Sequence, residues 1–379
     1  MEQVRLGIIG AGVQGSYHIR YLMQGAVPQI RLSAVCDIDP EKLERARTLT
    51  NGTAALYTDA QTLMHSGTVD AVLISTPHYM HPVLAMQALD AGLHIMVEKP
   101  AGVYVKNVRE LNEKAEKSGK VFGMMFNQRT NPLYSRLREL VQSGRLGELR
   151  RVNWIITDWY RPQYYYDNGD WRATWAGEGG GVLLNQNPHN LDLWQWICGM
   201  PKRVFALCEN GKYHRIEVED DVTVLAEYPN GATGVYITTT GEAPGTNRLE
   251  ITGSCGKAVV EDRTLKVWTL DTPEPVFSQT CRESFGAPRC TCEQIEPEGE
   301  ETAHPGILRD WAEAILHGTP LLAPGVEGIR ALQISNAIHL SAWQQRWADV
   351  PADEDVFLAE LNKRIASSHY HRGKEYEGC

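Results

Sequence analysis

The chain has 379 residues, a formal net charge of −10 at pH 7, and 42% hydrophobic and 22% charged residues. These values are typical of a globular protein with two domains or more, and the acidic balance argues against nucleic acid or an anionic membrane as the main partner. No apolar stretch is long enough to span a membrane, no signal peptide is expected, and the eight scattered cysteines indicate reduced thiols in a cytoplasmic protein without a metal site.

The first predicted element is a buried strand over Val4–Ile9, which is apolar and rich in β-branched residues. It leads into Gly10-Ala11-Gly12-Val13-Gln14-Gly15 and then into a helical stretch. In a dinucleotide-binding turn the first glycine allows the turn, the second lets a pyrophosphate approach the backbone, and the third lets the helix pack on the strand. Glycine-rich turns without a ligand show the same pattern, so the surrounding elements decide.

A second strand, Ile30–Cys36, ends at Asp37, which follows the last glycine of the turn by 22 residues. This is the place of a carboxylate that accepts hydrogen bonds from the adenosine ribose. Because its charge repels a 2′-phosphate, the sequence favours NAD over NADP, and Ile38 offers an apolar surface to the adenine. The alternative role for this carboxylate, a helix N-cap, is better filled by Asp39.

Strands and helices continue to alternate up to about residue 128, which predicts a parallel, doubly wound sheet and an NAD-binding Rossmann domain over residues 1–128. Polar or small residues follow two of its strands, at the edge where such sheets bind ligands. They are candidate cofactor contacts: Ser75, Thr76 and Pro77 after one strand, and Asn127 after another.

The apolar run His94–Val97 predicts a buried strand that stops at Glu98-Lys99-Pro100, because proline cannot donate to a sheet ladder. Glu98 and Lys99 are therefore expected at the ligand edge. A lysine held against an acid in such a place is a candidate for chemistry, whereas a surface charge pair is the alternative on residue type alone.

Four motifs of this domain resemble those of the glucose–fructose oxidoreductase / inositol dehydrogenase / MocA family: Gly10–Gly15, Asp37, Thr76-Pro77 with His81, and Glu98-Lys99-Pro100. The resemblance continues through the rest of the chain. It implies that Lys99 lies near the nicotinamide and the reacting hydroxyl, that Glu98 positions it, and that the peptide before Pro100 is often cis. His81 and Glu98 become candidate cofactor contacts.

Residues 129–350 are predicted to form an α+β substrate-binding and oligomerisation domain, in which helices near 304–343 pack back on the first domain. Three or four antiparallel strands are expected over Arg203–Leu270, where side chains alternate with period two. In the resembling family the free face of this sheet builds the oligomer, so a homo-oligomer is expected. The polar stretch Asp271–Glu301 predicts a long loop or an insertion, and residues 351–379 are predicted to form an amphipathic tail suited to a neighbouring subunit.

A long strand over Leu149–Trp159 precedes an aromatic segment that contains Tyr160 and Trp175. Sugar rings stack on aromatic side chains, which makes both residues candidate substrate contacts; oligomer contacts or a small core fit equally well. Trp171-Arg172 resembles a Trp-Arg pair of the family whose arginine reaches the cofactor or substrate. His304, at the start of a later helix, is a further candidate substrate contact, with a surface position as the alternative.

Gly179-Gly180-Gly181 precede a predicted apolar helix in which Asn185, His189 and Asp192 share one face. The family resemblance assigns the catalytic histidine to His189 and an acid to Asp192. It places a further acid at Asn185, where this sequence departs, because an amide cannot act as a base but still binds a hydroxyl. Pro188 is expected to kink the helix.

These features predict an NAD-dependent dehydrogenase that oxidises a secondary hydroxyl of a sugar or glycoside, with C3 of a pyranose as the favoured position. His189 is expected to act as the general base and Lys99 to stabilise charge on the reacting oxygen. Three alternatives stay open: an inositol 2-dehydrogenase, a glycosidase that retains NAD and cleaves by oxidation and elimination, and a dinucleotide-binding sugar sensor. The presence of Lys99 and His189 argues against the sensor.

Overall fold

The computed structural model describes residues 2–169, 171–296 and 298–368. The chain divides into two compact units. Unit 1 comprises Met1–Thr130 and Thr302–Leu332, and unit 2 comprises Asn131–Glu301 and Gln333–Cys379. Within the described residues, no helix is both long and apolar enough to cross a membrane.

Unit 1 contains a six-stranded parallel sheet with the strand order β3-β2-β1-β4-β5-β6. Its strands are β1 (Val4–Ile9), β2 (Ile30–Cys36), β3 (Ala55–Tyr57), β4 (Ala71–Ile74), β5 (His94–Val97) and β6 (Phe122–Met124). The strand order reverses between β1 and β4, so the carboxyl ends of these two strands form the topological switch point where doubly wound sheets bind ligands. The predicted Rossmann architecture is confirmed.

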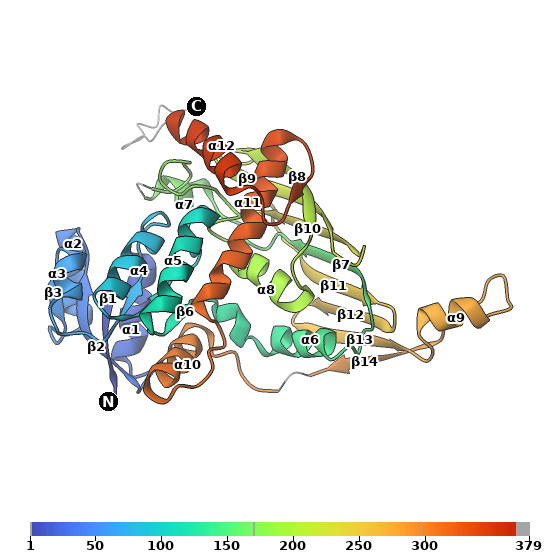
Figure 1. Ribbon diagram of the computed structural model, residues 1–379, viewed down its shortest axis with the longest axis horizontal. Coiled ribbons are helices and arrows are strands. Elements are labelled where there is room, and N and C mark those ends of the chain that lie inside the picture. The colour runs from blue at the N-terminus through green and yellow to red at the C-terminus, as the bar shows by residue number, and fades with distance from the viewer. Residues whose placement is uncertain (1, 170, 297, 369–379) are drawn as a thin grey trace. The chain divides into compact units, whose positions relative to one another are not determined.

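Helices join these strands: α1 (Val13–Met23), α2 (Pro40–Leu49), α3 (Ala60–Met64), α4 (Met80–Asp90), α5 (Val105–Ser118) and the short 3-10 helix η1 (Asn127–Thr130). Helices of this unit, among them α1, α4 and α5, lie around the sheet (Figure 1). A later part of the chain completes unit 1 with α10 (Ala303–His317) and the 3-10 helix η2 (Gly325–Glu327). Arg129, which is 1% exposed, joins η1 to this later part by donating to the Leu322 carbonyl at 3.0 Å and to Glu327 at 2.6 Å.

Unit 2 contains a nine-stranded mixed sheet with the order β14-β13-β12-β11-β7-β10-β9-β8-β15. Its strands are β7 (Leu149–Ile156), β8 (Arg203–Asn210), β9 (Glu219–Glu227), β10 (Thr233–Thr239), β11 (Asn247–Gly253), β12 (Gly256–Glu261), β13 (Thr264–Leu270), β14 (Cys290–Ile295) and β15 (Ala348–Asp349). The β7–β10 pair is parallel and the other described pairs are antiparallel, which confirms the predicted, mostly antiparallel sheet.

The prediction of three or four strands over Arg203–Leu270 was too low, because β8 to β13 all lie in this range. The turn between β12 and β13 consists of Asp262 and Arg263 alone, with φ of 49° and 59°. A two-residue turn with positive φ at both positions is a normal hairpin connection, but it is usually built from Asn or Gly. Without a glycine the turn is difficult to recognise in the sequence.

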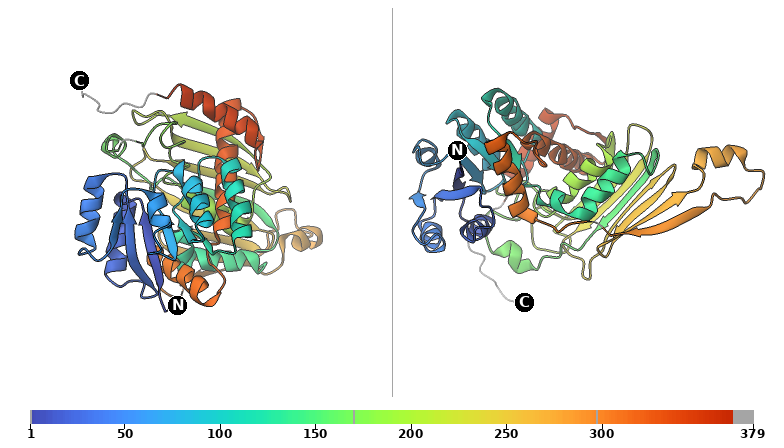
Figure 2. Two further views of the ribbon diagram at one scale, coloured as in Figure 1. Left: turned by 60° about the vertical axis from the view of Figure 1, so that its left-hand side comes forward. Right: turned by 90° about the horizontal axis from the view of Figure 1, so that it is seen from below.

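Of the two alternatives predicted for Asp271–Glu301, a long loop or an insertion, the long loop is wrong, because the stretch contains the helix α9 (Glu274–Thr280) and strand β14. β14 pairs with β13 at the edge of the sheet, and most of its side chains are exposed. Polar side chains are usual on edge strands because they oppose pairing with other chains, so composition alone misleads here. Figure 2 shows α9 at the end of an extension that leaves the sheet edge.

The remaining helices of unit 2 are α6 (Pro132–Gln142), α7 (Gln163–Asp167), α8 (Pro188–Cys198) and α12 (Glu354–Ala366), and α11 (Gly328–Gln344) begins in unit 1 and ends in unit 2. Residues 351–379 were predicted to form an amphipathic tail suited to a neighbouring subunit, and residues 369–379 of this tail lie outside the described residues. Instead Phe357 and Leu361 of α12 are buried, with the Phe357 ring stacked on Trp343 at 5.3 Å. The apolar face of α12 therefore packs against other residues of unit 2.

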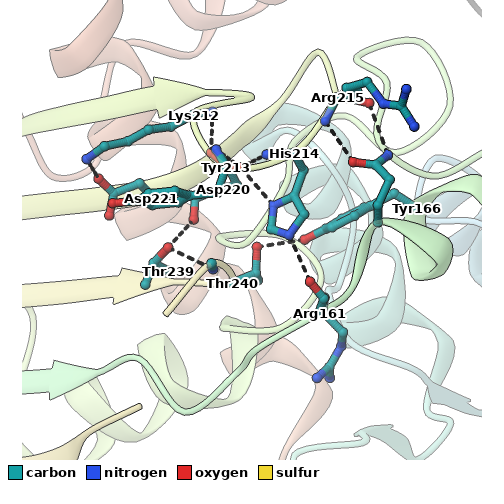
Figure 3. Close-up of polar contacts among 12 residues, drawn as sticks. Arg161, Tyr166, Lys212, Tyr213, His214, Arg215, Asp220, Asp221, Thr239 and Thr240 are labelled. Atoms are coloured by element: carbon teal, nitrogen blue, oxygen red, sulfur yellow. Dashed lines mark hydrogen bonds and ion pairs between the residues drawn. The ribbon is translucent and has the colours of Figure 1, made fainter. Parts of the chain in front are cut away.

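A buried aspartate fixes the connection between β8 and β9 and the aromatic segment beside it (Figure 3). Asp220 accepts hydrogen bonds from the backbone N–H groups of residues 212–214 and lies 2.9 Å from Nδ1 of His214. The other ring nitrogen of His214 lies 2.8 Å from the Arg161 carbonyl, and the Tyr166 ring packs on the imidazole. One carboxylate therefore holds both the turn and the aromatic segment.

We expect Asp220→Ala to lower the free energy of unfolding by about 3–5 kcal/mol, because it leaves buried N–H groups and a buried imidazole without their acceptor. Urea denaturation measures this loss. The neighbouring variant Asp221→Ala is the control: it removes an ion pair with the exposed Lys212, which is worth about 1 kcal/mol or less. Equal losses in the two variants would contradict the anchoring role of Asp220.

Candidate functional site

The glycine-rich turn of unit 1 combines close backbone packing with one open position. Gly10 has φ +98°, and a Cβ there would lie 2.4 Å from the Ser75 carbonyl oxygen. A Cβ at Gly15 would lie 1.9 Å from the Gly10 oxygen, so both positions require glycine. A Cβ at Gly12, the residue before α1, would meet no protein atom within 4 Å. Open space at a helix N-terminus is what a pyrophosphate needs.

Asp37 lies at the end of β2 and is 8% exposed. Its carboxylate accepts hydrogen bonds from the backbone N–H groups of Ala11, at 2.7 Å, and Asp39, at 3.0 Å. It therefore ties the glycine turn to β2 while each oxygen keeps a second lone pair for a ribose hydroxyl. Val13 and Ile38 are 70% and 88% exposed, so apolar surface for a dinucleotide flanks this carboxylate.

Among the buried polar atoms of unit 1 that lack hydrogen-bond partners in the described residues, two lie after strands of the sheet: Oγ1 of Thr76 and Oδ1 of Asn127. Both residues follow strands of the sheet, β4 and β6. Buried polar atoms without partners are rare in folded proteins and indicate an absent ligand or water. Together with the open position at Gly12, they fit a dinucleotide, and their roles as contacts stay predictions.

His81, which is 1% exposed, braces the loops at this edge. Its ring nitrogens lie 2.7 Å from the carbonyl oxygens of Thr76 and Pro100. Burial lowers the pKa of His81 although both carbonyls favour its charged form. The Lys99–Pro100 peptide between these loops is cis, as is often the case in the resembling family.

Glu98 is a buried carboxylate, 4% exposed, with a partner on each oxygen. Oε1 lies 2.5 Å from Nε2 of His18, and Oε2 accepts the backbone N–H of Lys99 at 3.2 Å. Burial alone would raise the pKa of Glu98, but the His18 hydrogen bond and the charges of His18, His304 and Lys99 lower it to about 2. The carboxylate is therefore ionised at neutral pH, and it holds the backbone of Lys99.

His304 lies beside this pair rather than on a plain surface. Its ring centroid is 5.7 Å from that of His18 and 6.4 Å from that of Tyr21, and burial lowers its pKa. The Tyr21 hydroxyl lies 2.7 Å from Nδ1 of His18. Sequence reasoning missed His18 and Tyr21, although His18 follows the last glycine of the turn by only three residues. A contact between His304 and a substrate stays a prediction.

In unit 2 the helix after the glycines begins later than predicted. α8 starts at Pro188, whose missing N–H costs nothing at a first helical position. Pro188 therefore opens the helix instead of kinking it, and Asn185 precedes the helix. The backbone between the glycines and α8 turns around Glu219, which accepts the N–H groups of Gly181 and Leu183 at 2.8 and 3.1 Å.

His189 and Asp192 do share a face of α8, one turn apart, and are 8% and 1% exposed. Asp192 accepts a hydrogen bond from Gln195 at 2.9 Å. An imidazole in the first turn of a helix with a carboxylate three residues later is suited to move a proton. Their catalytic and substrate-binding roles stay predictions.

Asn185 donates from its side-chain amide to Glu178, a residue that the sequence reasoning missed. Glu178 is 1% exposed, and its second oxygen accepts the Ala173 N–H at 2.7 Å. Glu178 directly precedes the three glycines. A charged residue next to a glycine run is typical of a surface loop, so its burial is not evident from the sequence. The structure thus places a buried carboxylate beside the position where the family has its first acid.

The aromatic segment divides into buried and exposed parts. Trp175 is 5% exposed and packs edge-on against His339 and Trp343 in the core of unit 2, whereas Tyr160 is 50% exposed. Tyr160 therefore offers a ring to a ligand, and the position of Trp175 favours the core. The Arg172 guanidinium lies over the rings of Trp171 and Tyr165, and its buried Nε has no hydrogen-bond partner among the described residues.

No group of three or more His, Cys, Asp and Glu side chains in the described ranges is arranged to hold a metal ion.

Two family profiles match the chain. The profile described as an oxidoreductase family with an NAD-binding Rossmann fold matches residues 4–126, and that of the GFO/IDH/MocA C-terminal domain matches residues 134–259. The rhizopine catabolism protein MocA of Rhizobium meliloti is 28% identical over 238 residues, which are 62% of this chain and 71% of that protein. These matches confirm the family resemblance and the NAD cofactor predicted from the sequence.

A D-glucoside 3-dehydrogenase of Escherichia coli is 31% identical over 209 residues, 52% of this chain and 55% of that protein. Among solved structures, the WlbA dehydrogenase from Chromobacterium violaceum in complex with NADH and UDP-GlcNAcA superposes with a TM-score of 0.79 at 26% identity. The match covers 93% of this chain and 97% of that one. These relatives are oxidoreductases, which confirms the predicted enzyme class.

We expect Gly12→Ala to weaken NADH binding at least tenfold without lowering the melting temperature. Its Cβ meets no protein atom and the backbone at this residue, with φ −64°, suits alanine, so the methyl group contacts only the bound pyrophosphate. Fluorescence titration with NADH and a thermal scan measure the two effects. Gly15→Ala is the contrast, because its Cβ clashes with backbone and lowers the melting temperature. Unchanged NADH affinity in Gly12→Ala would contradict the placement of the cofactor.

Proposed function

Because the chain belongs to the GFO/IDH/MocA oxidoreductase family, we propose that it oxidises a secondary hydroxyl of a sugar or glycoside to a ketone with NAD. The favoured position is C3 of a pyranose ring. The family and the use of NAD are findings, and the substrate class and the oxidised carbon are the proposal.

The observation that carries the proposal is the end of β5, where Glu98 is buried, ionised and bonded to the backbone of Lys99. Burying a charged group such as the Glu98 carboxylate costs free energy unless hydrogen bonds and opposite charges compensate for the lost water. Here the His18 hydrogen bond holds the Glu98 carboxylate in place, and the carboxylate in turn holds the backbone N–H of Lys99. A lysine placed in this way at the ligand edge of a Rossmann sheet supports a role in chemistry.

Oxidation of an alcohol removes a hydride from carbon and a proton from oxygen. NAD supplies the hydride acceptor when it is bound. His189 takes the hydroxyl proton as general base, and Asp192, one turn along α8, stabilises the imidazolium that results. The Lys99 ammonium donates to the same oxygen and stabilises its developing negative charge. The assignment of Lys99 and His189 to one reaction rests on the family resemblance.

The preference for a glycoside and for C3 rests on the relative from Escherichia coli, whose name describes that activity, and on the exposed aromatic ring of Tyr160. Sugar rings present C–H faces that stack on aromatic side chains. Asn185 and Arg172 supply hydrogen-bonding groups for hydroxyls in the same unit. Inositol oxidation and the NAD-retaining glycosidase are the competing outcomes of the first experiment below.

We also propose a homo-oligomer that forms through the open face of the unit 2 sheet. Leu207 of β8 and Leu225 of β9 are 60% and 47% exposed, which is unusual for leucines in the strands of a large sheet. A cytoplasmic location remains part of the proposal, on the basis of the cysteine content.

We expect NADH absorbance to rise when the protein is mixed with NAD and methyl glucosides, and to rise less with inositols and anhydrosugars. The same panel separates the alternatives. A rise with inositols alone would favour an inositol dehydrogenase. A flat trace with release of the aglycone would favour the NAD-retaining glycosidase, and a flat trace without release would favour the sensor.

We expect Lys99→Ala and His189→Ala each to lower kcat by a factor of about 10²–10⁴, the usual worth of one acid–base or charge-stabilising group. The dissociation constant of NADH should change by about threefold or less, since neither change affects the glycine turn. Lys117→Ala and His65→Ala, which alter exposed residues of the same types, are the controls. Turnover near the wild-type rate in both site variants would refute the assigned roles.

A further inference from the structure

A buried carboxylate–imidazole pair in unit 2 lies outside the groups that the proposed reaction uses. It joins Glu219, the first residue of β9, to His339 of α11, and the two residues are 0% and 1% exposed. Nε2 of His339 lies 3.1 Å from Oε2 of Glu219, although the two groups are not aligned as a hydrogen bond. Because a carboxylate attracts an N–H and repels a lone pair, the imidazole proton is expected on Nε2.

Two tryptophan rings hold the imidazole of His339 in one orientation. The imidazole stacks on the Trp343 ring, with the centroids 5.4 Å apart and an interplanar angle of 18°. The Trp175 ring meets it edge-on, with the centroids 5.7 Å apart and an angle of 75°. Aromatic contacts of this kind restrict how a ring can turn, so Nε2 keeps its place beside the carboxylate of Glu219.

The other carboxylate oxygen of Glu219 orders a turn of the backbone. Oε1 accepts the N–H groups of Gly181 and Leu183, at 2.8 and 3.1 Å. The main-chain carbonyl of Glu219 accepts the N–H of Val182 at 3.0 Å. Three consecutive N–H groups therefore end on one residue, and the side-chain part of this arrangement depends on how the carboxylate is turned.

This turn leads directly into α8. The Val182 carbonyl accepts the N–H of Asn187, the residue before α8, at 2.8 Å. The Asn187 carbonyl accepts the N–H groups of Asn190 and Leu191 at 3.0 and 2.9 Å. His189 is the second residue of α8, so this short series of hydrogen bonds sets the position of its backbone.

The pair also explains two of the three glycines before the turn. A Cβ at Gly181 would lie 2.0 Å from the Glu219 carbonyl oxygen, and a Cβ at Gly180 would lie 3.1 Å from Cε1 of His339. The glycines let the backbone pack directly on the two residues. A displacement of the carboxylate or of the imidazole therefore reaches the turn without a flexible side chain between them.

We propose that His339 is a positioning residue for the general base: through Glu219 it fixes the turn that sets the place of His189. Without the N–H at Nε2, Oε2 of Glu219 loses the donor group beside it in a buried place, which favours rotation of the carboxylate. Rotation moves Oε1 away from the two N–H groups that it accepts. A catalytic group misplaced by about 1 Å lowers turnover by a factor of about 10². The inference rests on the proposed function, in which His189 takes the hydroxyl proton.

The variants His339→Leu and His339→Gln separate the imidazole N–H from the bulk of the side chain. Leucine keeps an apolar group beside the tryptophans, whereas glutamine returns an N–H near the position of Nε2. We expect kcat with the glucoside to fall by a factor of about 10–100 in His339→Leu and to return to within about threefold of the wild type in His339→Gln. The dissociation constant of NADH should change by about twofold or less in both. Ser335→Ala, which alters another buried polar residue one turn earlier on α11, is the matched control and should keep the wild-type kcat.

A double variant decides between positioning of the base and general support of the fold. If His339 acts through His189, removal of both costs no more than removal of His189. The double variant His189→Ala/His339→Leu should therefore match His189→Ala within about threefold. A role in overall stability would instead multiply the two losses. Losses that multiply, or a wild-type kcat in folded His339→Leu, would overturn the proposal.

The coupling is also measurable without substrate, by NMR of protein labelled with carbon-13 at the histidine Cε1 atoms. The resonance that is absent from His189→Ala identifies His189. We expect this resonance to shift in His339→Leu, to return toward its wild-type place in His339→Gln and to stay unchanged in Ser335→Ala. A resonance that stays in place in His339→Leu would contradict the coupling.

A second variant covers the case in which His339→Leu does not fold. Glu219→Gln keeps an oxygen for the two N–H groups and turns an NH₂ group toward His339, so it should shift the His189 resonance and lower kcat in the same way; an unchanged resonance and kcat would overturn the proposal. Absence of turnover by the wild type with every sugar would remove the proposed function, and the NMR comparison would still decide whether His339 positions His189.

Discussion

Buried carboxylates that accept backbone N–H groups hold the irregular segments on which both units depend. A buried charge is costly unless several donors surround it, and backbone N–H groups of a tight turn provide such donors at fixed positions. The hydrogen bonds that offset the cost of burying each carboxylate therefore also hold a loop in one conformation. The pairs are Asp37 with the N–H of Ala11, Glu98 with that of Lys99, Glu178 with that of Ala173, Glu219 with those of Gly181 and Leu183, and Asp220 with those of residues 212–214.

This constraint explains which parts of the molecule could be predicted from the sequence. The Rossmann sheet follows from local patterns: apolar strands, a glycine turn in which Gly10 and Gly15 touch backbone, and Asp37 at a fixed spacing. The start of α8 was missed because the turn before it is ordered by Glu219, which follows its donors Gly181 and Leu183 by 38 and 36 positions. The turn at Asp262-Arg263 lacks the glycine that marks most hairpins. Long-range acceptors and unusual turn residues leave no local pattern.

The residues of the candidate site also fall into two groups, those that were predicted from the sequence and those that only the structure revealed. Lys99 and His189 were predicted as catalytic residues because their motifs resemble those of the family in a fixed order along the chain, and their roles stay predictions. His18 and Glu178 were missed because each acts through a partner that is distant or embedded in a loop: His18 reaches Glu98 across 80 residues, and Glu178 reaches back to Ala173 and forward to Asn185. The candidate reactive groups could therefore be proposed from the sequence, whereas their neighbours His18 and Glu178 required the structure. The departure at Asn185 is understandable only beside Glu178.

The most direct test of the account is to follow the hydrogen that leaves the substrate. Methyl glucoside carrying deuterium on C3 is incubated with the protein and NAD, and the reduced cofactor is analysed by mass spectrometry. The account predicts that the NADH formed carries the deuterium and forms more slowly than from the unlabelled glucoside. NADH that forms without deuterium would place the oxidation at another carbon, and the absence of labelled and unlabelled NADH from every sugar tested would contradict the proposed dehydrogenase activity.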